Sequence, residues 1–325
     1  MHGSLVPAVL DSFAGKKKKK KSELVHQNWV ELKNVDKLER LLEIDQSPPG
    51  KTSTSCPASF LGVFDDIRKL YALLPEAKAR GWTASHFSFN TGKGRCLNCG
   101  GRGYLRIPMS FLPEATAECE ICNGVRYNEE TESLTYQGIS IGALLKRTMS
   151  EAREILVNHK SIRRTLDYVH ELGLGYLTLG QPTHTLSGGE TQRLKIAREL
   201  GLREAVDTLY ILDEPTIGLH MADVDKLVGV LFKLRDKGNT LVVIEHNLDV
   251  LRAADHLIEI GPGPGAKGGE VIFEGTPDKM AKMRTETPTQ RFFAKVGQES
   301  DKRKAGAGTR SKNLIANSDS RMCNE

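Results

Sequence analysis

Residues 208–212 form an unbroken apolar run that is partly β-branched and carries no charge. Such a run is typical of a strand buried on both faces of a parallel sheet. Asp213 and Glu214 follow directly, so we expect them at the carboxyl end of the strand, where ligands bind in open α/β sheets. An Asp there can hold Mg²⁺ through its water shell while the next carboxylate orients an attacking water. The alternative is that both acids only cap the following turn.

A second pattern precedes this strand. Residues 191–202 repeat apolar side chains at helical spacing, directly after Ser187, Gly188, Gly189 and Glu190. A hydroxyl and two unhindered N–H groups at the start of a helix attract anions. A Ser-Gly-Gly turn is only a helix cap in most proteins, but its combination with the carboxylate strand favours a nucleotide site.

A loop that cradles phosphates would read G-x-x-x-x-G-K-[ST], because its glycines let successive N–H groups converge on phosphate and its lysine neutralises the charge. Residues 50–52 match only the end of this pattern. Asp45 stands where the first glycine is required, and Pro48 and Pro49 have no N–H groups to donate. Residues 92–94 lack the final Ser or Thr. We therefore expect neither site to be a phosphate loop.

Four cysteines form two Cys-x-x-Cys pairs, Cys96 with Cys99 and Cys119 with Cys122. Nineteen residues separate the pairs, a spacing expected of a four-thiolate structural zinc site. Two disulfides are the alternative, but the first residues lack the apolar segment of an export signal, and reducing cytosol disfavours disulfides. The other two cysteines are expected to be ordinary thiols, namely Cys56 and Cys323.

Between the cysteine pairs, residues 104–110 and 115–118 are expected to form a hairpin. Basic side chains surround it in the sequence: Lys93, Arg95, Arg102, Arg106 and Arg126. Basic groups on a small metal-stabilised hairpin suit contact with a phosphate backbone. Local composition alone favours ordinary solvated surface charge.

Several strings of residues occur here in the order in which one family has them. They are Ile44-Asp-Gln-Ser-Pro, Pro57-Ala-Ser-Phe-Leu-Gly-Val-Phe, Phe87-Ser-Phe-Asn, the two cysteine pairs, Arg126-Tyr-Asn, Leu179-Gly-Gln, Leu186-Ser-Gly-Gly-Glu, Asp213-Glu-Pro-Thr and Ile244-Glu-His-Asn. Over residues 30–285 the chain resembles the C-terminal half of the UvrA family, the damage-recognising ATPases of bacterial nucleotide excision repair. That family belongs to the ABC class of ATPases.

The resemblance implies an α/β fold: an ABC-type ATPase domain with a P-loop NTPase-like parallel sheet and helices, lacking its first phosphate-loop unit, with an inserted four-Cys zinc module. It implies catalytic roles for Glu214 and His246. Nucleotide contacts are implied for Gln46, Ser187, Gly188, Gly189, Glu190 and Asp213. Zinc would be held by Cys96, Cys99, Cys119 and Cys122. DNA contacts are expected from Lys93, Arg95, Arg102 and Arg106. Residues 216–220 resemble the loop that couples two nucleotide sites.

The implied cofactors are Zn²⁺ and ATP with Mg²⁺, the nucleotide only in a composite site. The implied partners are double-stranded DNA with lesions, a UvrA-type homodimer or another chain that supplies a Walker A loop, and a UvrB-type repair subunit. In the family the second phosphate loop precedes the matched region. We therefore expect a truncated C-terminal half, from a fragment, a split gene or a misplaced start, that is unable to hydrolyse ATP alone.

A non-catalytic, zinc-stapled fragment that contacts DNA or protein is the alternative function. A drug-exporting ABC ATPase is less favoured because the cysteine pairs have no place in one. The expected segments are 1–29 with a lysine run, 30–82 with the Q-loop, 83–130 with zinc, 131–285 with the rest of the ATPase domain, and a polar, disordered 286–325. The net charge of +5 is compatible with DNA binding. No apolar run approaches eighteen residues, so we expect a cytoplasmic protein without a membrane span.

Overall fold

The computed structural model describes residues 5–16, 33, 35–50, 54–107, 115–202, 207–263, 268–283, 287 and 289–293. The chain divides into two units, residues 1–244 and 245–325. The end of the first expected hairpin arm, residues 108–110, lies outside the described residues, as do most of the tail at 286–325 and Cys323. Within that tail, residues 289–293 are helical and Phe293 is buried. Of the lysine run, only Lys16 is described.

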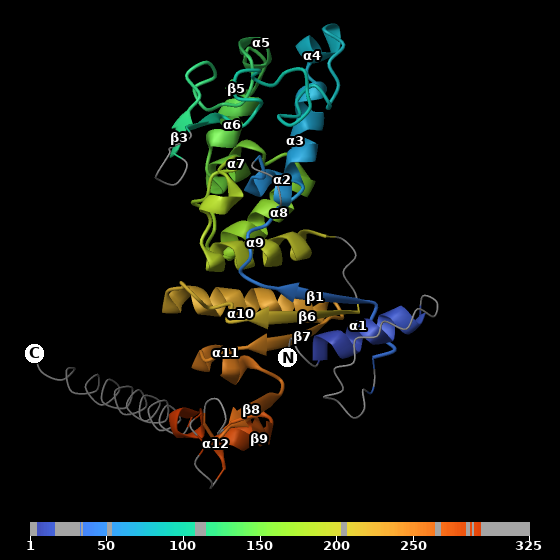
Figure 1. Cartoon of the computed structure of the whole chain (residues 1–325), viewed down its shortest axis with the longest axis vertical. Helices are drawn as coiled ribbons and strands as arrows, with labels where there is room; N and C mark the ends of the chain where they lie inside the picture. The colour runs from blue at the N-terminus through green and yellow to red at the C-terminus, as the bar shows by residue number, and fades with distance from the viewer. Residues whose placement is uncertain are drawn as a thin grey trace, which may run out of the picture. The chain divides into compact units, whose positions relative to one another are not determined.

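Within the described residues, a parallel sheet of three strands organises the first unit. Its order is β1 (Arg40–Ile44), β6 (Thr208–Asp213) and β7 (Thr240–Ile244), with β6 in the middle (Figure 1). The unbroken apolar run of β6 is explained by burial on both faces. Leu209 and Ile211 pack against helix α1 (Leu5–Lys16), whereas Tyr210 and Leu212 join the main core on the opposite face.

Helices build the main core beside this sheet. The longer ones are α3 (Val63–Ala72), α8 (Lys160–Glu171), α9 (Gly188–Gly201) and α10 (Met221–Asp236). Shorter helices complete the set: α2 (Pro57–Phe60), α4 (Pro75–Ala79), α5 (Glu129–Glu132), α6 (Ile141–Lys146), α7 (Met149–Ile155) and the 3₁₀ turn η1 (Thr183–Thr185). Helix α9 begins at Gly188, three residues earlier than its apolar periodicity suggests, because Ser187 caps it.

The expected hairpin between the cysteine pairs is present. Strands β2 (Tyr104–Ile107) and β3 (Ala115–Glu118) pair antiparallel, with Tyr104 opposite Glu118. A second small pair, β4 (Thr135–Tyr136) and β5 (Ile139–Ser140), leads into α6. The cysteines form a small cluster of their own next to β2. The fold prediction, a parallel sheet with helices and an inserted four-cysteine cluster, is confirmed.

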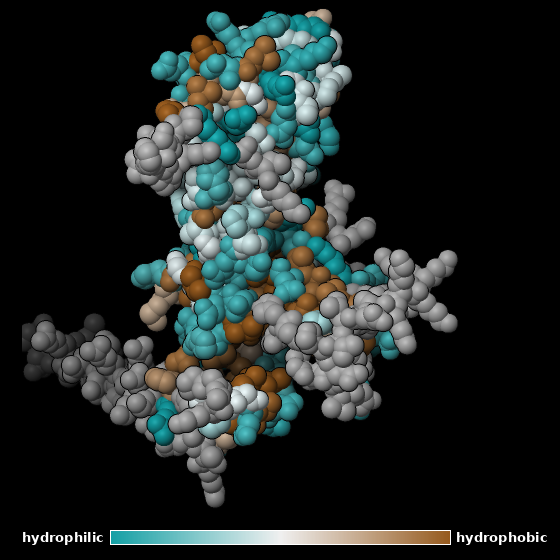
Figure 2. Space-filling model, viewed as in Figure 1, coloured by the Kyte–Doolittle hydropathy of each residue, from teal (hydrophilic) through white to brown (hydrophobic). Residues whose placement is uncertain are grey.

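The second unit contains α11 (Leu248–Ala253), the antiparallel strands β8 (Leu257–Gly261) and β9 (Glu270–Gly275), and α12 (Pro277–Ala281). Its small core consists of Leu257, Phe273, Met280 and Phe293. Figure 2 shows apolar surface over β8 and β9, where Ile258, Ile260 and Val271 are exposed. None of the described helices is both long enough and apolar enough to cross a membrane.

Candidate nucleotide and metal sites

Three of the predicted site residues, two nucleotide contacts and one catalytic residue, lie at or just after strand ends at one edge of the sheet. Asp213 ends β6 and is exposed, Glu214 follows it, and Gln46 comes two residues after the end of β1. Because Ile44 pairs with Leu212 in a parallel ladder, these carboxyl ends lie side by side. The φ of Glu214 is 46°, an unusual value for a non-glycine residue, and its main-chain N–H donates to Ile244 at 2.8 Å. The turn therefore fixes the direction in which the chain leaves β6.

Helix α9 is fastened to this edge by a buried amide. The Nε2 group of Gln192 donates to the carbonyls of Ile44 at 3.0 Å and Asp213 at 2.7 Å, the last residues of β1 and β6. Gln192 is fully buried. One turn further along, Lys195 donates to the Asp45 carbonyl at 3.0 Å and pairs with its carboxylate. Burial opposes ionisation of Asp45, but the hydrogen bonds from Lys195 and Ser47 lower its pKa.

The N-terminus of α9 is capped by the side chains of Ser187 and Glu190. The Ser187 hydroxyl accepts from the Glu190 N–H at 3.3 Å, and the Glu190 carboxylate accepts from the Ser187 N–H at 2.7 Å. The Tyr176 hydroxyl also donates to Glu190. Burial alone would raise the pKa of Glu190, yet the hydrogen bonds from Tyr176 and Ser187 lower it. An anion approaching this helix start would therefore meet a carboxylate already bound there.

The two glycines of this turn are needed for close packing. A Cβ atom on Gly188 would lie 2.5 Å from Oε1 of Gln46, and one on Gly189 would lie 2.5 Å from the carbonyl oxygen of Ile217. Ile217 belongs to the predicted coupling loop, and Arg193 also donates to its carbonyl at 3.2 Å. The structure thus brings the start of α9 together with Gln46 and with the loop at residues 216–220.

His246 belongs to the second unit and comes two residues after the end of β7. Its side chain is exposed, and its main-chain N–H donates to the Glu245 carboxylate at 2.9 Å. Gly50, in the rejected phosphate-loop match, has a φ of 95°, and the next helix among the described residues begins at Pro57.

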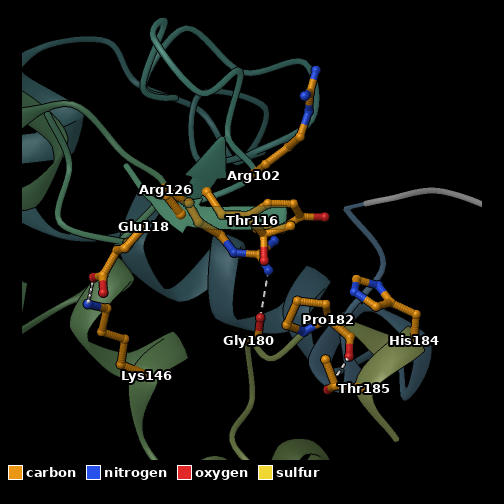
Figure 3. A pocket seen from close by; sticks show the side chains of 13 residues that line it. Arg102, Thr116, Glu118, Arg126, Lys146, Gly180, Pro182, His184 and Thr185 are labelled. Carbon is orange, nitrogen blue, oxygen red and sulfur yellow. Dashed lines mark hydrogen bonds and ion pairs between the residues drawn. The ribbon is translucent and has the colours of Figure 1, made fainter. Parts of the chain in front are cut away.

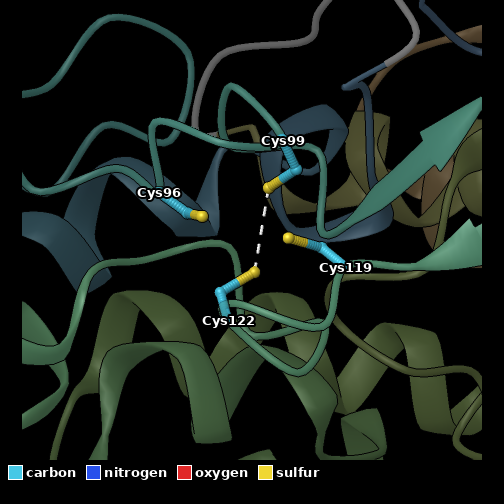
Figure 4. Close-up of side chains that lie close together, drawn as sticks. All are labelled: Cys96, Cys99, Cys119 and Cys122. Carbon is cyan, nitrogen blue, oxygen red and sulfur yellow. Dashed lines mark hydrogen bonds between the residues drawn. The ribbon is translucent and has the colours of Figure 1, made fainter.

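The four paired cysteines converge on one point (Figure 4). Their Sγ atoms all lie within 4.8 Å of one another and are buried, and the Sγ atoms of Cys99 and Cys122 are 3.7 Å apart. A tetrahedral ion with Zn–S bonds of about 2.3 Å requires sulfur separations of roughly 3.8 Å. All five described cysteines are free of disulfides. The donor set and its spacing therefore fit a four-thiolate metal ion better than two disulfides.

Hydrogen bonds distinguish the thiols. The Gly103 N–H donates to Cys99 Sγ at 3.2 Å, and the Asn98 side chain donates to Cys119 Sγ at 3.3 Å. Burial opposes ionisation of Cys119, but its hydrogen bonds, that from Asn98 first, lower its pKa to about 6. Burial raises the pKa of Cys122 to about 12, and bonds with the neighbouring thiols add to this. Binding of a divalent metal here would release protons, as thiolate sites do.

The basic residues around the hairpin divide into two groups. Lys93, Arg102 and Arg106 are exposed, and Arg95 is half-buried and donates to the Asn90 carbonyl. Arg126 is only 4% exposed, so the expectation that it belongs to a basic surface is wrong. It points inward because two carbonyls accept its guanidinium and the Phe89 ring stacks against it, with the guanidinium carbon 4.7 Å from the ring centroid.

A cavity of about 330 Å³ separates the hairpin from residues 180–185 (Figure 3). Arg102 contributes to its rim, whereas Lys93, Arg95 and Arg106 do not line it. Lys146, on another wall, pairs with Glu118 at 2.9 Å. Of the four predicted DNA residues, this cavity therefore involves Arg102 alone.

Comparison with known proteins identifies relatives. No family model matches the chain. It is 53% identical over 251 residues to UvrABC system protein A of Aquifex aeolicus, which covers 77% of this chain. It is 51% identical over 265 residues to the protein of the same name from Thermus thermophilus, covering 82% of the chain. Over the matched region the chain belongs to the UvrA family.

The chain spans 27% and 28% of the lengths of these two UvrA relatives. The fold agrees as well. A crystal structure of UvrA2 from Deinococcus radiodurans superposes with a TM-score of 0.74 at 44% identity, covering 79% of this chain and 32% of that one. The resemblance to UvrA stated from the sequence motifs is thus confirmed.

Two residues of this UvrA-type chain gain importance only in three dimensions. Gln192 holds together segments that lie 148 and 21 residues away, and Arg126 reaches segments 72 and 54 residues away. The polar Gln192 on the apolar face of a periodic helix was the one local signal, since such a residue must find hydrogen-bond partners when buried. No local signal separated Arg126 from the exposed arginines.

Proposed function

We propose that this chain acts as an ATP-binding, DNA-binding component in UvrABC nucleotide excision repair, where it helps to recognise damaged DNA. The observation that carries the proposal is its identity of 51–53% to two proteins named UvrABC system protein A. The bound DNA would be double-stranded and carry lesions, and a UvrB-type subunit would act next. The geometry of the sheet edge and of the cysteine cluster supports the same proposal.

The nucleotide chemistry would be shared between modules. Gln46, Asp213 and Glu214 would serve one nucleotide: Asp213 holding Mg²⁺ through water, Glu214 orienting the attacking water, and Gln46 contacting Mg²⁺. The resemblance implies a phosphate contact for His246. The start of α9, from Ser187 to Glu190, would contact the γ-phosphate held by another module. The printed residues contain no G-x-x-x-x-G-K-[ST] string, so another chain or module must cradle the phosphates.

ATP supplies the phosphoryl chemistry when bound, and this chain's residues contribute position and charge. The shared edge of β1 and β6 keeps Gln46 beside Asp213, and the Gln192 amide fixes α9 against both strand ends. A phosphate reaching the start of α9 would have to compete with Glu190 for the N–H of Ser187.

The composite arrangement can be tested by ATP turnover in trans. We expect the purified chain to hydrolyse no Mg-ATP by itself. Turnover should appear on mixing with a UvrA protein that keeps its phosphate loops but carries a disabled second signature helix. Ser187→Arg in this chain should abolish that rescue, whereas Ser133→Arg, at an exposed position after α5, should not. Turnover by the chain alone would refute the composite site.

The metal would be Zn²⁺ held by Cys96, Cys99, Cys119 and Cys122. Four buried sulfurs within 4.8 Å of one another support this, because thiolate ligands select zinc among the common divalent ions. Zinc would fix the two knuckles and the hairpin between them, with Lys93, Arg95, Arg102 and Arg106 facing DNA. Binding to a duplex with one bulky adduct, compared with the unmodified duplex, tests the DNA part. Equal affinity for both would contradict damage recognition by this chain.

A further inference from the structure

Arg126 is attached to both halves of the cysteine cluster through its main chain. Its carbonyl accepts from the Cys96 N–H at 2.9 Å, and its N–H donates to the sulfur of Cys122. Its φ is 76°, a left-handed conformation that a residue with a large side chain rarely adopts. Such a conformation persists when the surroundings enforce it. The position of the Arg126 backbone therefore depends on how the two knuckles are held.

The side chain of Arg126 leaves the module and crosses to the ATPase domain. Its Nη2 group donates to the Gly180 carbonyl at 2.6 Å, as the dashed line in Figure 3 shows, and its Nη1 group donates to the Thr54 carbonyl at 3.3 Å. The guanidinium stacks on the ring of Phe89. No carboxylate in the described residues pairs with it, so main-chain carbonyls and an aromatic face compensate this buried charge. Charge-assisted bonds of this kind are stronger and more directional than neutral ones.

The two accepting carbonyls belong to the segments that carry predicted nucleotide contacts. Thr54 lies eight residues after Gln46, and Gly180 lies seven residues before Ser187. The segments are also bonded to each other: the Ala58 N–H donates to Leu179, and the Thr183 N–H donates to Ser55, both at 3.0 Å. A shift of the guanidinium would act on both segments together.

We propose that Arg126 is a positioning residue that couples the occupancy of the four-cysteine site to the two segments 54–58 and 179–187. Metal binding fixes the knuckles, the knuckles fix the Arg126 backbone, and the guanidinium fixes residues 54–58 and the approach to the start of α9. The inference rests on the proposed metal binding. To the proposed metal binding, the inference adds a route from the module to the predicted nucleotide contacts.

Hydrogen exchange on the full chain tests this route without requiring ATP turnover. Exchange would be followed by mass spectrometry in peptides that contain Ala58, Gly180 and Thr183, before and after zinc is removed with a chelator. In the wild type we expect removal to speed exchange there by about 5-fold or more, the range of typical coupling energies. In Arg126→Met, which keeps the length of the stem, exchange should already be fast with zinc bound, and chelation should add little.

Matched variants make the outcome decisive. Arg102→Met removes an exposed arginine from the same module and should respond to chelation as the wild type does. Arg126→Lys keeps one donating group and should give an intermediate response; it also replaces the methionine variant if that one fails to fold. A full chelation response in folded Arg126→Met or an unchanged one in Arg126→Lys would overturn the coupling. Absence of zinc in the wild type, by elemental analysis, would instead refute the proposed metal site.

Discussion

The side-chain amide of Gln192 donates to the main-chain carbonyl of Asp213 at 2.7 Å. Its second hydrogen bond is to the carbonyl of Ile44, the last residue of the neighbouring strand β1. One side chain thus ties the helix that begins at Gly188 to the strand that ends in a carboxylate. Because both proposed nucleotide contacts are fixed to the same amide, they cannot move independently without breaking it.

Replacement of Gln192 should destabilise the first unit strongly. Gln192→Leu keeps the approximate volume but leaves the carbonyls of Ile44 and Asp213 without this donor, so we expect a loss of about 1–3 kcal/mol in the free energy of unfolding. Urea denaturation measures this. Gln46→Leu removes the same group from an exposed loop and should change stability by less than about 0.5 kcal/mol.

Gln192→Glu should behave differently with pH. At neutral pH a carboxylate would face two carbonyls in a buried site, so this variant should be less stable than Gln192→Leu. Burial raises the pKa of a carboxyl, and its protonated form can donate one hydrogen bond. The difference from the wild type should therefore shrink as the pH falls. If the Glu and Leu variants show equal stabilities at every pH, the amide is not acting as a donor.

The two glycines at the start of α9 should tolerate alanine unequally. Gly189→Ala places a Cβ atom 2.5 Å from a main-chain oxygen, whereas the neighbour at Gly188 is the movable end of Gln46. We expect a loss of about 1–3 kcal/mol for Gly189→Ala and a smaller one for Gly188→Ala. Gly229→Ala, in open space on α10, should instead stabilise by about 0.5–1 kcal/mol. Thermal or urea denaturation of all three variants measures these stability changes, and equal losses for Gly188→Ala and Gly189→Ala would contradict the expected order.

Loss of one thiol should release the metal. We expect Cys122→Ser to reduce bound zinc from about one ion per chain to a small fraction, because a structural site needs all four ligands. Elemental analysis of purified protein measures the content. Cys56→Ala is the matched control, since Cys56 is buried but lies outside the cluster. Equal zinc content in both variants would argue against binding by the cluster.

Acid should remove the contribution of Glu190. Its folded pKa lies below the ordinary value of 4.5, so its stabilising effect is present above that value and is lost as the pH falls through the lowered pKa. Glu190→Gln keeps an acceptor but does not titrate. The stability advantage of the wild type over this variant should thus decline below pH 4.5. Urea midpoints across this range would reveal a pH-independent difference if the assignment is wrong.

The exposed arginines of the hairpin should govern the salt dependence of DNA binding. Arg102→Ala combined with Arg106→Ala should weaken affinity and make the slope of log K against log salt shallower by about 1.8, from two lost phosphate contacts at about 0.9 each. Fluorescence anisotropy across a salt titration measures both quantities. An unchanged slope would remove this hairpin from the DNA surface. Lys282→Ala, exposed in the second unit, is the control.

Local pattern was sufficient wherever a residue's role depends on its neighbours in sequence. The apolar run before Asp213 predicted a strand buried on both faces, and the spacing of the cysteines predicted their convergence. Partners that are distant in sequence could not be predicted. Arg102 and Arg126 each follow a cysteine pair and a glycine in the sequence, yet Arg102 is exposed and Arg126 is buried. Carbonyls from remote segments accept the guanidinium of Arg126.

The inward reach of Arg126 also bears on how this insertion could be transplanted. If residues 83–130 were grafted onto another protein, the Arg126 guanidinium would still point out of the module. It would need two carbonyl oxygens and an aromatic ring in the positions that it contacts here. Phe89 would travel with the graft, but Thr54 and Gly180 would stay behind. A designer would have to supply two replacement carbonyls or substitute the arginine, because its hydrogen-bond acceptors lie outside the module.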